Sequence, residues 1–230
     1  MLAAGSGSRL KAGEGSFALP KPLVPLAGKP LLEHVLTRLV TIEPRRIIVV
    51  LGHGHQQIEQ FLNELDLGIE IAPVINPAPE RENGYSLLQA EGLVGESFLV
   101  VMADHLVDPA IYRAAAGHRG LGLGVDFAPR PYLVGEATKV LVEDERIVRI
   151  GKNIEKWDGL DTGVFSLTPQ AFRVLHRLEG RPRLTLTDMA RELIAMGKPL
   201  VAIDVSGRRW FDIDTNEDLK RSLELLSPPL

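Results

Sequence analysis

Apolar residues recur with helical spacing in the segment LLEHVLTRLV, residues 31–40. The apolar side chains that share one face of this helix are Leu32, Val35, Leu36 and Leu39. The next apolar run, RRIIVVLGHG at 45–54, is continuous, rich in β-branched residues and closed by glycines. Such a run is typical of a buried parallel strand, so the two segments predict a helix that leads into a sheet.

This alternation continues to about residue 110. Two further segments, HQQIEQFLNELD at 55–66 and GYSLLQAEGLV at 84–94, have helical patterns. Two others, GIEIAPVI at 68–75 and ESFLVVMADH at 96–105, have strand patterns, and the second ends at an acidic residue. Regular alternation of this kind predicts a doubly wound α/β sheet.

The second half of the chain has a mixed pattern. Strands are predicted at 120–129 and 161–169, and the EDER turn between alternating segments predicts a hairpin within 138–151. Thr185 and Asp188 have capping-box spacing at the start of a predicted helix, 185–197. Residues 199–226 predict a strand, a short acidic segment and a closing helix.

Together these patterns predict an α/β three-layer sandwich with a mostly parallel, Rossmann-like but mixed central sheet. A chain of 230 residues is within the range of one domain, and it shows no linker, internal repeat or low-complexity region. We therefore expect a single domain over 1–230, with a regularly alternating half at 1–110 and a mixed half at 111–230.

Composition narrows the class of protein. With 45% hydrophobic and 24% charged residues the chain has the balance of a globular protein, and a net charge of −4 argues against nonspecific nucleic-acid binding. The absence of cysteine excludes a disulfide framework and a thiolate zinc site. No apolar run approaches the ~18 residues that cross a bilayer, and a glycine-rich segment stands where a signal peptide would be, so we expect a cytoplasmic protein without membrane insertion.

Glycines gather with basic residues in the first 30 positions. The segment GSGSRL lacks the third glycine of the dinucleotide-binding motif, and the chain has no GxxxxGK[ST] phosphate loop. What remains is a glycine turn whose backbone N–H groups can approach a phosphate, followed by Arg9 and Lys21 to neutralise it.

These residues carry a family resemblance. LAAGSGSRL followed by PKPLVPLAGKPLLEHVL resembles the signature of the nucleotidyltransferases that join a nucleoside triphosphate to a sugar phosphate or alcohol phosphate. Further along, NGYSLLQAE, VMADHLVDP, VGEATKVLVEDERIVRIGK, DTGVF and WFDIDTNEDL resemble the CTP:inositol-1-phosphate cytidylyltransferases over nearly the whole chain. The resemblance implies the nucleotide-diphospho-sugar transferase fold and transfer of a cytidylyl group from CTP to inositol 1-phosphate, with Mg²⁺ as cofactor. It also implies a nucleotide-binding half at 1–110 and an acceptor-binding half at 111–230.

The sequence departs from the family pattern at its start. Only Met1 and Leu2 precede Ala3, so we expect a shortened first strand. The loop KAGEGSFALPKP is longer than the family's, which bears on the reach of Arg9.

Metal ligands are expected among the acidic residues. Asp104 follows a buried strand, where open α/β sheets bind their ligands, and carboxylates suit Mg²⁺. The resemblance adds Asp214 as the second ligand, with Asp212 as the alternative. An acidic residue next to Thr215 at a helix start can also be a helix cap.

The resemblance assigns three cations to catalysis: Lys21 to the triphosphate, Arg9 to the departing pyrophosphate, and Lys139 to the acceptor phosphate and the α-phosphate. It places the nucleotide against the glycine turn and the NGYS segment, and the expected contacts are Ala3, Ala4, Gly5, Gly7, Asn83, Gly84 and Ser86. The acceptor is expected to contact His105, Glu136, Lys139 and Asp161. No general base is required, because a phosphate monoester is already an anionic nucleophile near pH 7.

Other readings remain open. A CTP:phosphocholine or sugar-1-phosphate nucleotidyltransferase would share the fold, although a choline cage needs several aromatic side chains and the sequence has three Tyr and two Trp. A noncatalytic nucleotide-binding subunit would be expected to lose Lys21 or Asp104, and the chain has both. The expected partners are CTP and inositol 1-phosphate. A homodimer and a separately encoded CDP-alcohol transferase are also considered, since family members are often fused to such a domain and none follows Leu230.

Overall fold

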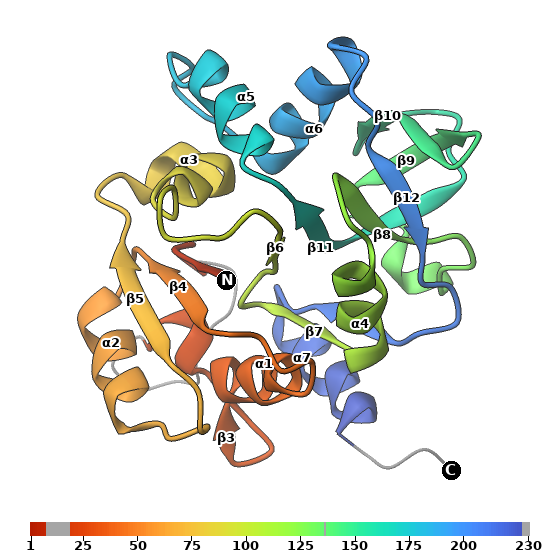
Figure 1. Cartoon of the computed structure of the whole chain (residues 1–230). Coiled ribbons are helices and arrows are strands. Elements are labelled where there is room, and N and C mark those ends of the chain that lie inside the picture. Colours follow the sequence, from red (N-terminus) through yellow and green to blue (C-terminus); the bar gives the residue numbers. More distant parts are fainter. Residues whose placement is uncertain (8–18, 136, 227–230) are drawn as a thin grey trace.

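The computed structural model describes residues 1–7, 19–135 and 137–226 (Figure 1). Its first sheet is parallel and has the order β1-β4-β5. The strands of this sheet are β1 (Leu2–Ala3), β4 (Ile47–Leu51) and β5 (Ile71–Ile75). A parallel bridge between Leu2 and Met102 connects this sheet to the segment that follows β6 (Phe98–Val100).

The second sheet is mixed and has the order β6-β11-β8-β12-β10-β9. Its further strands are β8 (Gly122–Asp126), β9 (Lys139–Glu143), β10 (Arg146–Gly151), β11 (Gly159–Leu167) and β12 (Val201–Asp204). Strand β12 runs parallel to β8, whereas β11 is antiparallel to β6, β8 and β9. Parallel pairing therefore characterises the first half of the chain and mainly antiparallel pairing the second.

Two small strand pairs complete the description. Strand β7 (His105–Val107) pairs with β13 (Trp210–Asp212), and β2 (Pro25–Leu26) pairs with β3 (Lys29–Pro30). Both the β6–β11 and the β7–β13 pairings cross residue 110, so they connect the two halves of the chain.

Helices cover both faces of the sheets. The described α-helices are α1 (Leu31–Val40), α2 (His55–Glu64), α3 (Glu82–Leu88), α4 (Pro109–Gly117), α5 (Gln170–Leu178), α6 (Leu186–Ala195) and α7 (Asn216–Ser222). The short 3₁₀ helices are η1 (Lys21–Leu23), η2 (Pro79–Arg81), η3 (Pro131–Leu133) and η4 (Leu223–Leu225). Helices α3, α5 and α6 lie together on one side of the sheets, and α1 and α4 lie on the other (Figure 1).

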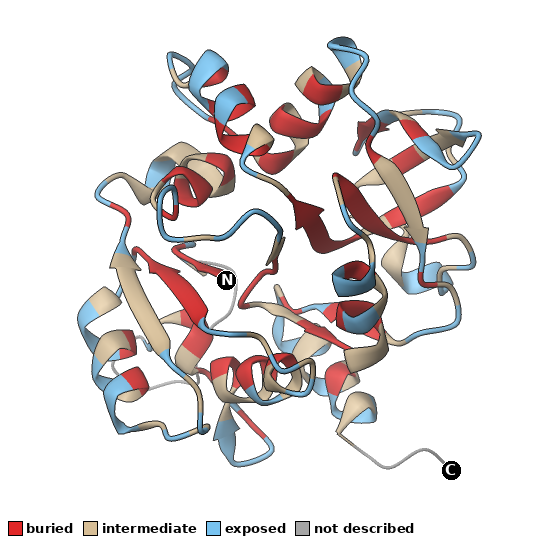
Figure 2. Cartoon of the chain, viewed as in Figure 1, coloured by how far each residue is buried: buried red, intermediate tan, exposed pale blue. Residues whose placement is uncertain are grey.

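Strand β4 shows how the layers form. Its Ile47, Val49 and Leu51 belong to the hydrophobic core that contains the buried face of α1, while Ile48 and Val50 belong to the core beneath α3, α5 and α6. Alternate side chains of a strand point to opposite faces, so both faces of β4 are buried, as Figure 2 shows by its red ribbon. The α/β three-layer sandwich predicted from the sequence is confirmed.

Local sequence signals account for several element boundaries. Thr185 caps α6 through a capping box with Asp188, and the described helix α1 begins and ends where the pattern predicted. In the β9–β10 hairpin the two turn residues, Asp144 and Glu145, both have positive φ, 47° and 63°, as a two-residue hairpin turn requires.

Four segments depart most from the prediction. The helix expected at 84–94 spans Glu82–Leu88. The strand expected at 96–105 is two strands, β6 and β7, and Asp104 lies in the break between them. Helices α4 and α5 were not predicted.

Within the described residues, none of the helices combines the length and apolar character that a membrane crossing requires. The cytoplasmic location and the single-domain organisation stay predictions.

Candidate active site

A cleft of about 720 Å³ lies where the two halves of the chain meet. The side chains on its wall come from the glycine turn, η1, α3, the β6–β7 break, β11 and the segment that leads into α7. The cleft is lined by most of the residues predicted to bind ligands: Ala4, Gly5, Gly7, Lys21, Asn83, Ser86, Asp104, His105, Asp161, Asp212 and Asp214. The structure therefore brings together residues from distant parts of the chain; Lys21 and Asp214, for example, are 193 positions apart.

A lysine between two carboxylates is the most buried charged group of the cleft. The Nζ of Lys21 lies 2.7 Å from Oδ2 of Asp104 and 2.8 Å from Oδ1 of Asp214. The Lys21 side chain is 7% exposed, whereas those of Asp104 and Asp214 are 35% and 26% exposed. The lysine lies beneath the two carboxylates, which face the cleft.

The pKa values of this group reflect opposing effects. Burial lowers the pKa of the Lys21 ammonium, but the charges and hydrogen bonds of Asp104 and Asp214 outweigh it, so the pKa is raised. Burial raises the pKa of Asp104, and the opposing attraction of Lys21 and His105 brings it below its ordinary value. Lys21 and Asp104 therefore form a pair of opposite charges at neutral pH.

The role of helix cap at the start of α7 belongs to Thr215. Its hydroxyl accepts a hydrogen bond from the backbone N–H of Asp218, while the carboxylate of Asp218 accepts from the N–H and the hydroxyl of Thr215. Asp214 is one residue before the cap, and its carboxylate binds Lys21 instead. The capping alternative considered for Asp214 is thus wrong.

His105 is fixed by a backbone contact. Its Nδ1 donates to the carbonyl oxygen of Thr162 at 3.0 Å, which leaves Nε2 3.5 Å from Asp212 and 3.9 Å from Asp104. Burial lowers the pKa of His105, but Asp212, Asp104 and the Thr162 carbonyl raise it by more, so the net shift is upward.

Gly163 makes room for this imidazole. Its φ is +75°, and a Cβ on it would lie 2.3 Å from Nδ1 of His105. A side chain at this position would therefore displace the ring.

Asp161 is an acidic residue of β11 that lines the cleft. Its Oδ1 accepts a hydrogen bond from the N–H of Gly163 at 2.7 Å. Burial raises the pKa of Asp161 to about 6, although that hydrogen bond and His105 act in the opposite direction.

The acidic groups of the cleft fit a divalent cation. Asp104, His105 and Asp212 each offer a ligand atom, and these atoms lie within 4.8 Å of one another. Asp104 also shares the Lys21 ammonium with Asp214, so a positive charge already lies between these two carboxylates. Carboxylate oxygens are the ligands that Mg²⁺ prefers, so the donor set suits the expected metal.

The residues predicted to bind the nucleotide differ in their surroundings. Gly7 has φ +59°, and a Cβ on it would lie 2.3 Å from Cβ of Lys21, so the glycine turn packs directly on the lysine stem. Gly84 donates its N–H to the carbonyl of Leu184 at 2.9 Å and does not contribute to the cleft wall, and a Cβ on it would meet that carbonyl at 2.8 Å. Gly84 therefore serves close packing between α3 and the start of α6.

Asn83 and Ser86 line the cleft while making internal hydrogen bonds. Oδ1 of Asn83 accepts from the N–H of Leu186, and Oγ of Ser86 accepts from Nδ2 of Asn76 and donates to the carbonyl of Glu82. These bonds fix both side chains relative to α6 and β5.

The remaining predicted residues fall in three groups. Ala3 is buried in the core, in β1, next to the cleft residue Ala4. Lys139 does not contribute to the described cleft wall; its ammonium donates to the carbonyl of Lys152 at 2.9 Å. Arg9 and Glu136 lie outside the described residues.

Several cleft residues were missed from the sequence. Thr138 and Lys152 line the cleft next in sequence or space to the predicted Lys139, and Arg221 of α7 and Tyr132 line it as well. The guanidinium of Arg221 lies 5.3 Å from the Tyr132 ring centre. The IGK segment that contains Lys152 was part of the family resemblance, so that residue could have been found.

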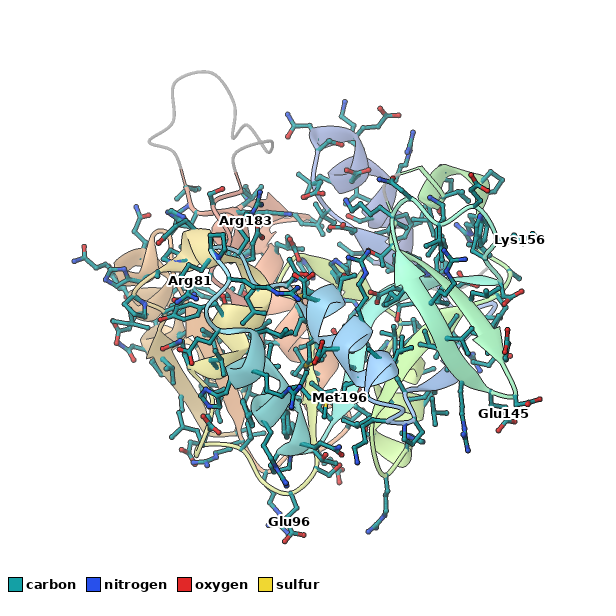
Figure 3. All side chains as sticks on the ribbon, turned by 90° about the horizontal axis from the view of Figure 1, so that it is seen from above. Arg81, Glu96, Glu145, Lys156, Arg183 and Met196 are labelled. Carbon is teal, nitrogen blue, oxygen red and sulfur yellow. The ribbon has the colours of Figure 1, made fainter. Side chains whose placement is uncertain are left out.

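Glu82 was also missed. It has φ +79°, lines the cleft and forms an ion pair with Arg183. Its neighbour Arg81 stacks over the ring of Tyr85, 3.9 Å from the ring centre, and Arg81 and Arg183 lie on the same side of the molecule (Figure 3). The ion pair and the stacking stabilise this strained backbone at the cleft wall.

A larger cavity, about 930 Å³, is present at the opposite ends of β4 and β6. Its wall is formed mostly by apolar residues, including those of β4, β6 and the segment after α3, and its charged side chains are Arg45, Arg46 and Glu96. It contains no converging carboxylates, so the smaller, polar cleft is the candidate active site.

The fold and the cleft together define a nucleotidyltransferase. The chain belongs to the MobA-like NTP transferase domain family, whose sequence model matches residues 1–128.

Individual relatives are consistent with this class. The chain is 36% identical over 228 residues to the bifunctional IPC transferase and DIPP synthase of Aquifex aeolicus, and 36% identical over 229 residues to the protein of the same name from Rubrobacter xylanophilus. Each alignment covers 98% of this chain and 51% of the relative, so the chain spans about half the length of these relatives. The solved structure of the inositol-1-phosphate CTP transferase from T. maritima superposes with a TM-score of 0.87, at 28% identity, covering 98% of this chain and 92% of that chain.

Proposed function

We propose that this chain transfers the cytidylyl group of CTP to myo-inositol 1-phosphate, which yields CDP-inositol and pyrophosphate, with Mg²⁺ as the cofactor. The observation that carries the proposal is the convergence of Lys21, Asp104 and Asp214 with His105 and Asp161 in one cleft. The first group suits a metal-bound triphosphate, and the second suits a polyol. The names of the relatives from A. aeolicus and T. maritima support the same pair of substrates.

The reaction is a substitution at the α-phosphorus of the nucleotide. An oxygen of the acceptor's phosphate forms a bond to the α-phosphorus, and the bond from that phosphorus to the bridging oxygen of the β-phosphate breaks, so pyrophosphate leaves. No proton has to be removed from the nucleophile. The catalytic task of the cleft is therefore to neutralise charge and to align the two phosphates.

Lys21 supplies fixed positive charge to the triphosphate, and Asp104 with Asp214 or Asp212 would hold Mg²⁺. When bound, Mg²⁺ neutralises the phosphate charge that develops as pyrophosphate leaves. The glycine turn at Gly5 and Gly7 offers backbone N–H groups to the phosphates, and Arg9 is assigned to pyrophosphate from the resemblance.

The acceptor side has two hydrogen-bonding groups for a polyol. Asp161 accepts hydrogen bonds from hydroxyl groups, and His105 borders the same space. The cations proposed for the acceptor phosphate are Lys152, which lines the cleft, and Lys139, which donates to the carbonyl of Lys152. Glu136 is assigned to the acceptor from the resemblance. The base of CTP is assigned to the backbone of Ala3, Ala4 and Gly5 and to Asn83 and Ser86.

A choline acceptor fits this cleft less well. Trp210 and Phe211 border the cleft, but they are 3% and 2% exposed, so their ring faces are buried in the core. Tyr132 is 42% exposed, but its ring stacks on Phe211 and the Arg221 guanidinium lies 5.3 Å from the ring centre. One accessible ring does not form a cage for a quaternary ammonium.

A CDP-alcohol transferase is the class of enzyme that would consume CDP-inositol, whether on the same polypeptide or on another. The relatives' names include a second activity, DIPP synthase, which belongs to those proteins.

The test is a pyrophosphate-release assay with Mg²⁺ in which each of the four nucleoside triphosphates is combined with inositol 1-phosphate, phosphocholine or glucose 1-phosphate. We expect turnover with CTP and inositol 1-phosphate, and its loss in Asp104→Ala. Turnover with another pair would retain the class of enzyme and contradict the substrate assignment.

A further inference from the structure

The ammonium of Lys21 is shared by two carboxylates that come from distant parts of the chain. Asp104 is 83 residues from Lys21 and Asp214 is 193 residues away, yet both oxygens lie within 2.8 Å of Nζ. The lysine thereby connects the β6–β7 break to the segment before α7. Without a cation between them, these two carboxylates would repel each other.

A divalent metal ion held between Asp104 and Asp214 competes for the oxygens that bind Lys21. Mg²⁺ binds carboxylate oxygens at about 2.0–2.1 Å, and its charge repels an ammonium that contacts the same atoms. The two ion pairs of Lys21 and metal coordination at Oδ2 of Asp104 or Oδ1 of Asp214 therefore exclude each other.

We propose that Lys21 is an internal counter-ion that exchanges with the divalent cation at Asp104 and Asp214, so that the site accepts metal together with nucleotide rather than metal alone. This inference rests on the proposed function and specifies how its cofactor and substrate bind. When metal binds alone, Lys21 loses both carboxylates and gains no anion. When the metal arrives with a triphosphate, the ammonium exchanges carboxylate oxygens for phosphate oxygens.

The packing of Gly7 on Lys21 indicates that the ammonium needs only a small movement for this exchange. The stem of Lys21 lies against the glycine turn so closely that a Cβ on Gly7 would be 2.3 Å from Cβ, 3.2 Å from Cγ and 3.3 Å from Cδ of the lysine. The turn that offers backbone N–H groups to phosphates is therefore adjacent to the lysine stem. Rotation about the outer bonds of the side chain moves Nζ from the carboxylates toward that turn without displacing η1.

Linkage makes the consequence measurable. If the ammonium competes with metal, its removal must tighten metal binding in the absence of nucleotide, by a factor in the usual range of coupling between sites, about 5- to 150-fold. The same change must weaken CTP binding in the presence of EDTA, because the triphosphate loses its lysine.

The experiment measures Mn²⁺ binding without nucleotide, by electron paramagnetic resonance, for the wild type, Lys21→Met and Lys21→Arg. Lys29→Met is the matched control, because Lys29 is an exposed lysine whose partner, Glu33, lies outside the cleft lining. We expect tighter Mn²⁺ binding in Lys21→Met, and affinities within a factor of two or so of the wild type in the other two variants. Unchanged or weaker Mn²⁺ binding in a folded Lys21→Met would overturn the proposal.

A second measurement uses the wild-type chain, in case Lys21→Met does not fold. In protein labelled with ¹³C,¹⁵N-lysine, the Nζ signal of Lys21 should shift strongly with Mg²⁺ and CTP together and far less with Mg²⁺ alone. An equal shift in both conditions, or none with either, would contradict the exchange.

The two proposals can fail separately. A wild type that neither binds CTP nor releases pyrophosphate would refute the proposed function. Full turnover of the wild type, together with unchanged Mn²⁺ affinity in Lys21→Met, would refute only the exchange.

Discussion

Gly163 and His105 illustrate how one backbone conformation determines the position of a functional ring. Gly163 has a positive φ and no side chain, and the imidazole of His105 lies in the space that a Cβ would fill. The carbonyl of the preceding residue, Thr162, accepts the hydrogen bond that orients the ring. Position and orientation of His105 both depend on a two-residue stretch of β11.

Gly163→Ala should therefore reduce turnover with inositol 1-phosphate on the order of 10²-fold, the effect expected from misplacing a contact by about 1 Å. Gly92→Ala is the control, because Gly92 also has φ +75° but a Cβ on it meets no atom within 4 Å. Both variants should lose about 1–2 kcal/mol of stability from the backbone conformation. Equal activity in the two variants, measured as kcat/KM, would show that His105 has no part in the reaction.

Asp161 should make stability depend on pH. Burial raises its pKa to about 6 in the folded chain, above the ordinary value of 3.8, so between these values the folded state binds more protons than the unfolded state. The free energy of unfolding then falls as pH rises from about 4 to about 6.

Asp161→Asn should remove this cost. We expect the variant to be more stable than the wild type by about 1–3 kcal/mol at pH 7, with the difference vanishing near pH 4. Urea unfolding at the two pH values measures it. A stability difference that is the same at pH 4 and pH 7 would refute the assigned pKa.

The local sequence identified these residues better than it identified their roles. Asp104 and Lys21 could be predicted because each is part of a short motif. Their contact could not, because it depends on the packing of segments 83 residues apart. Asn83 and Gly84 are neighbours in one motif, yet Asn83 lines the cleft whereas Gly84 packs against Leu184.

At the scale of elements, α7 is one of the helices that begin at the cleft. Its capping box joins Thr215 to Asp218, and the carboxylate of Asp218 also accepts a hydrogen bond from the N–H of Asp214 at 3.2 Å. The cap thus stabilises the helix and restrains the backbone of a predicted metal ligand.

Asp218→Ala should lower the free energy of unfolding by about 0.5–2 kcal/mol, as the loss of a helix cap does, and should also reduce turnover. Asp108→Ala is the matched control, since Asp108 caps α4 by accepting from the N–H of Ala110 and lies outside the cleft lining. We expect a similar loss of stability there, measured by urea unfolding, with turnover unchanged. A loss of turnover of the same size in both variants would mean that stability alone is responsible.

The elements that the sequence predicts well are those with a complete local signal. Helix α1 has a regular apolar face, and the β9–β10 hairpin has polar turn residues between alternating strands. Helix α4 was missed although Asp108 and Pro109 form an N-cap and first-turn signal. The strand at 96–105 was predicted as continuous because its apolar run does not reveal the break that exposes Asp104 to the cleft.

At the scale of the whole molecule, the site requires both halves of the chain. Strand β6 pairs with β11 and β7 pairs with β13, and one hydrophobic core contains residues of α1 together with Trp210 and Phe211. The division predicted at residue 110 therefore separates two halves whose strands pair with each other and whose apolar residues share one core. Halves connected in this way should not unfold independently.

We expect a single unfolding transition, although chains above about 150 residues often deviate from two-state behaviour. Both tryptophans, Trp157 and Trp210, lie in the second half, so their fluorescence reports on 111–230, while far-ultraviolet circular dichroism reports on helices of both halves. In urea the two signals should have the same midpoint. Leu99→Pro, which removes a backbone donor in β6 where that strand pairs with Ser166 of β11, should weaken the connection and separate the midpoints. Separate midpoints in the wild type would mean that 1–110 and 111–230 are independent domains.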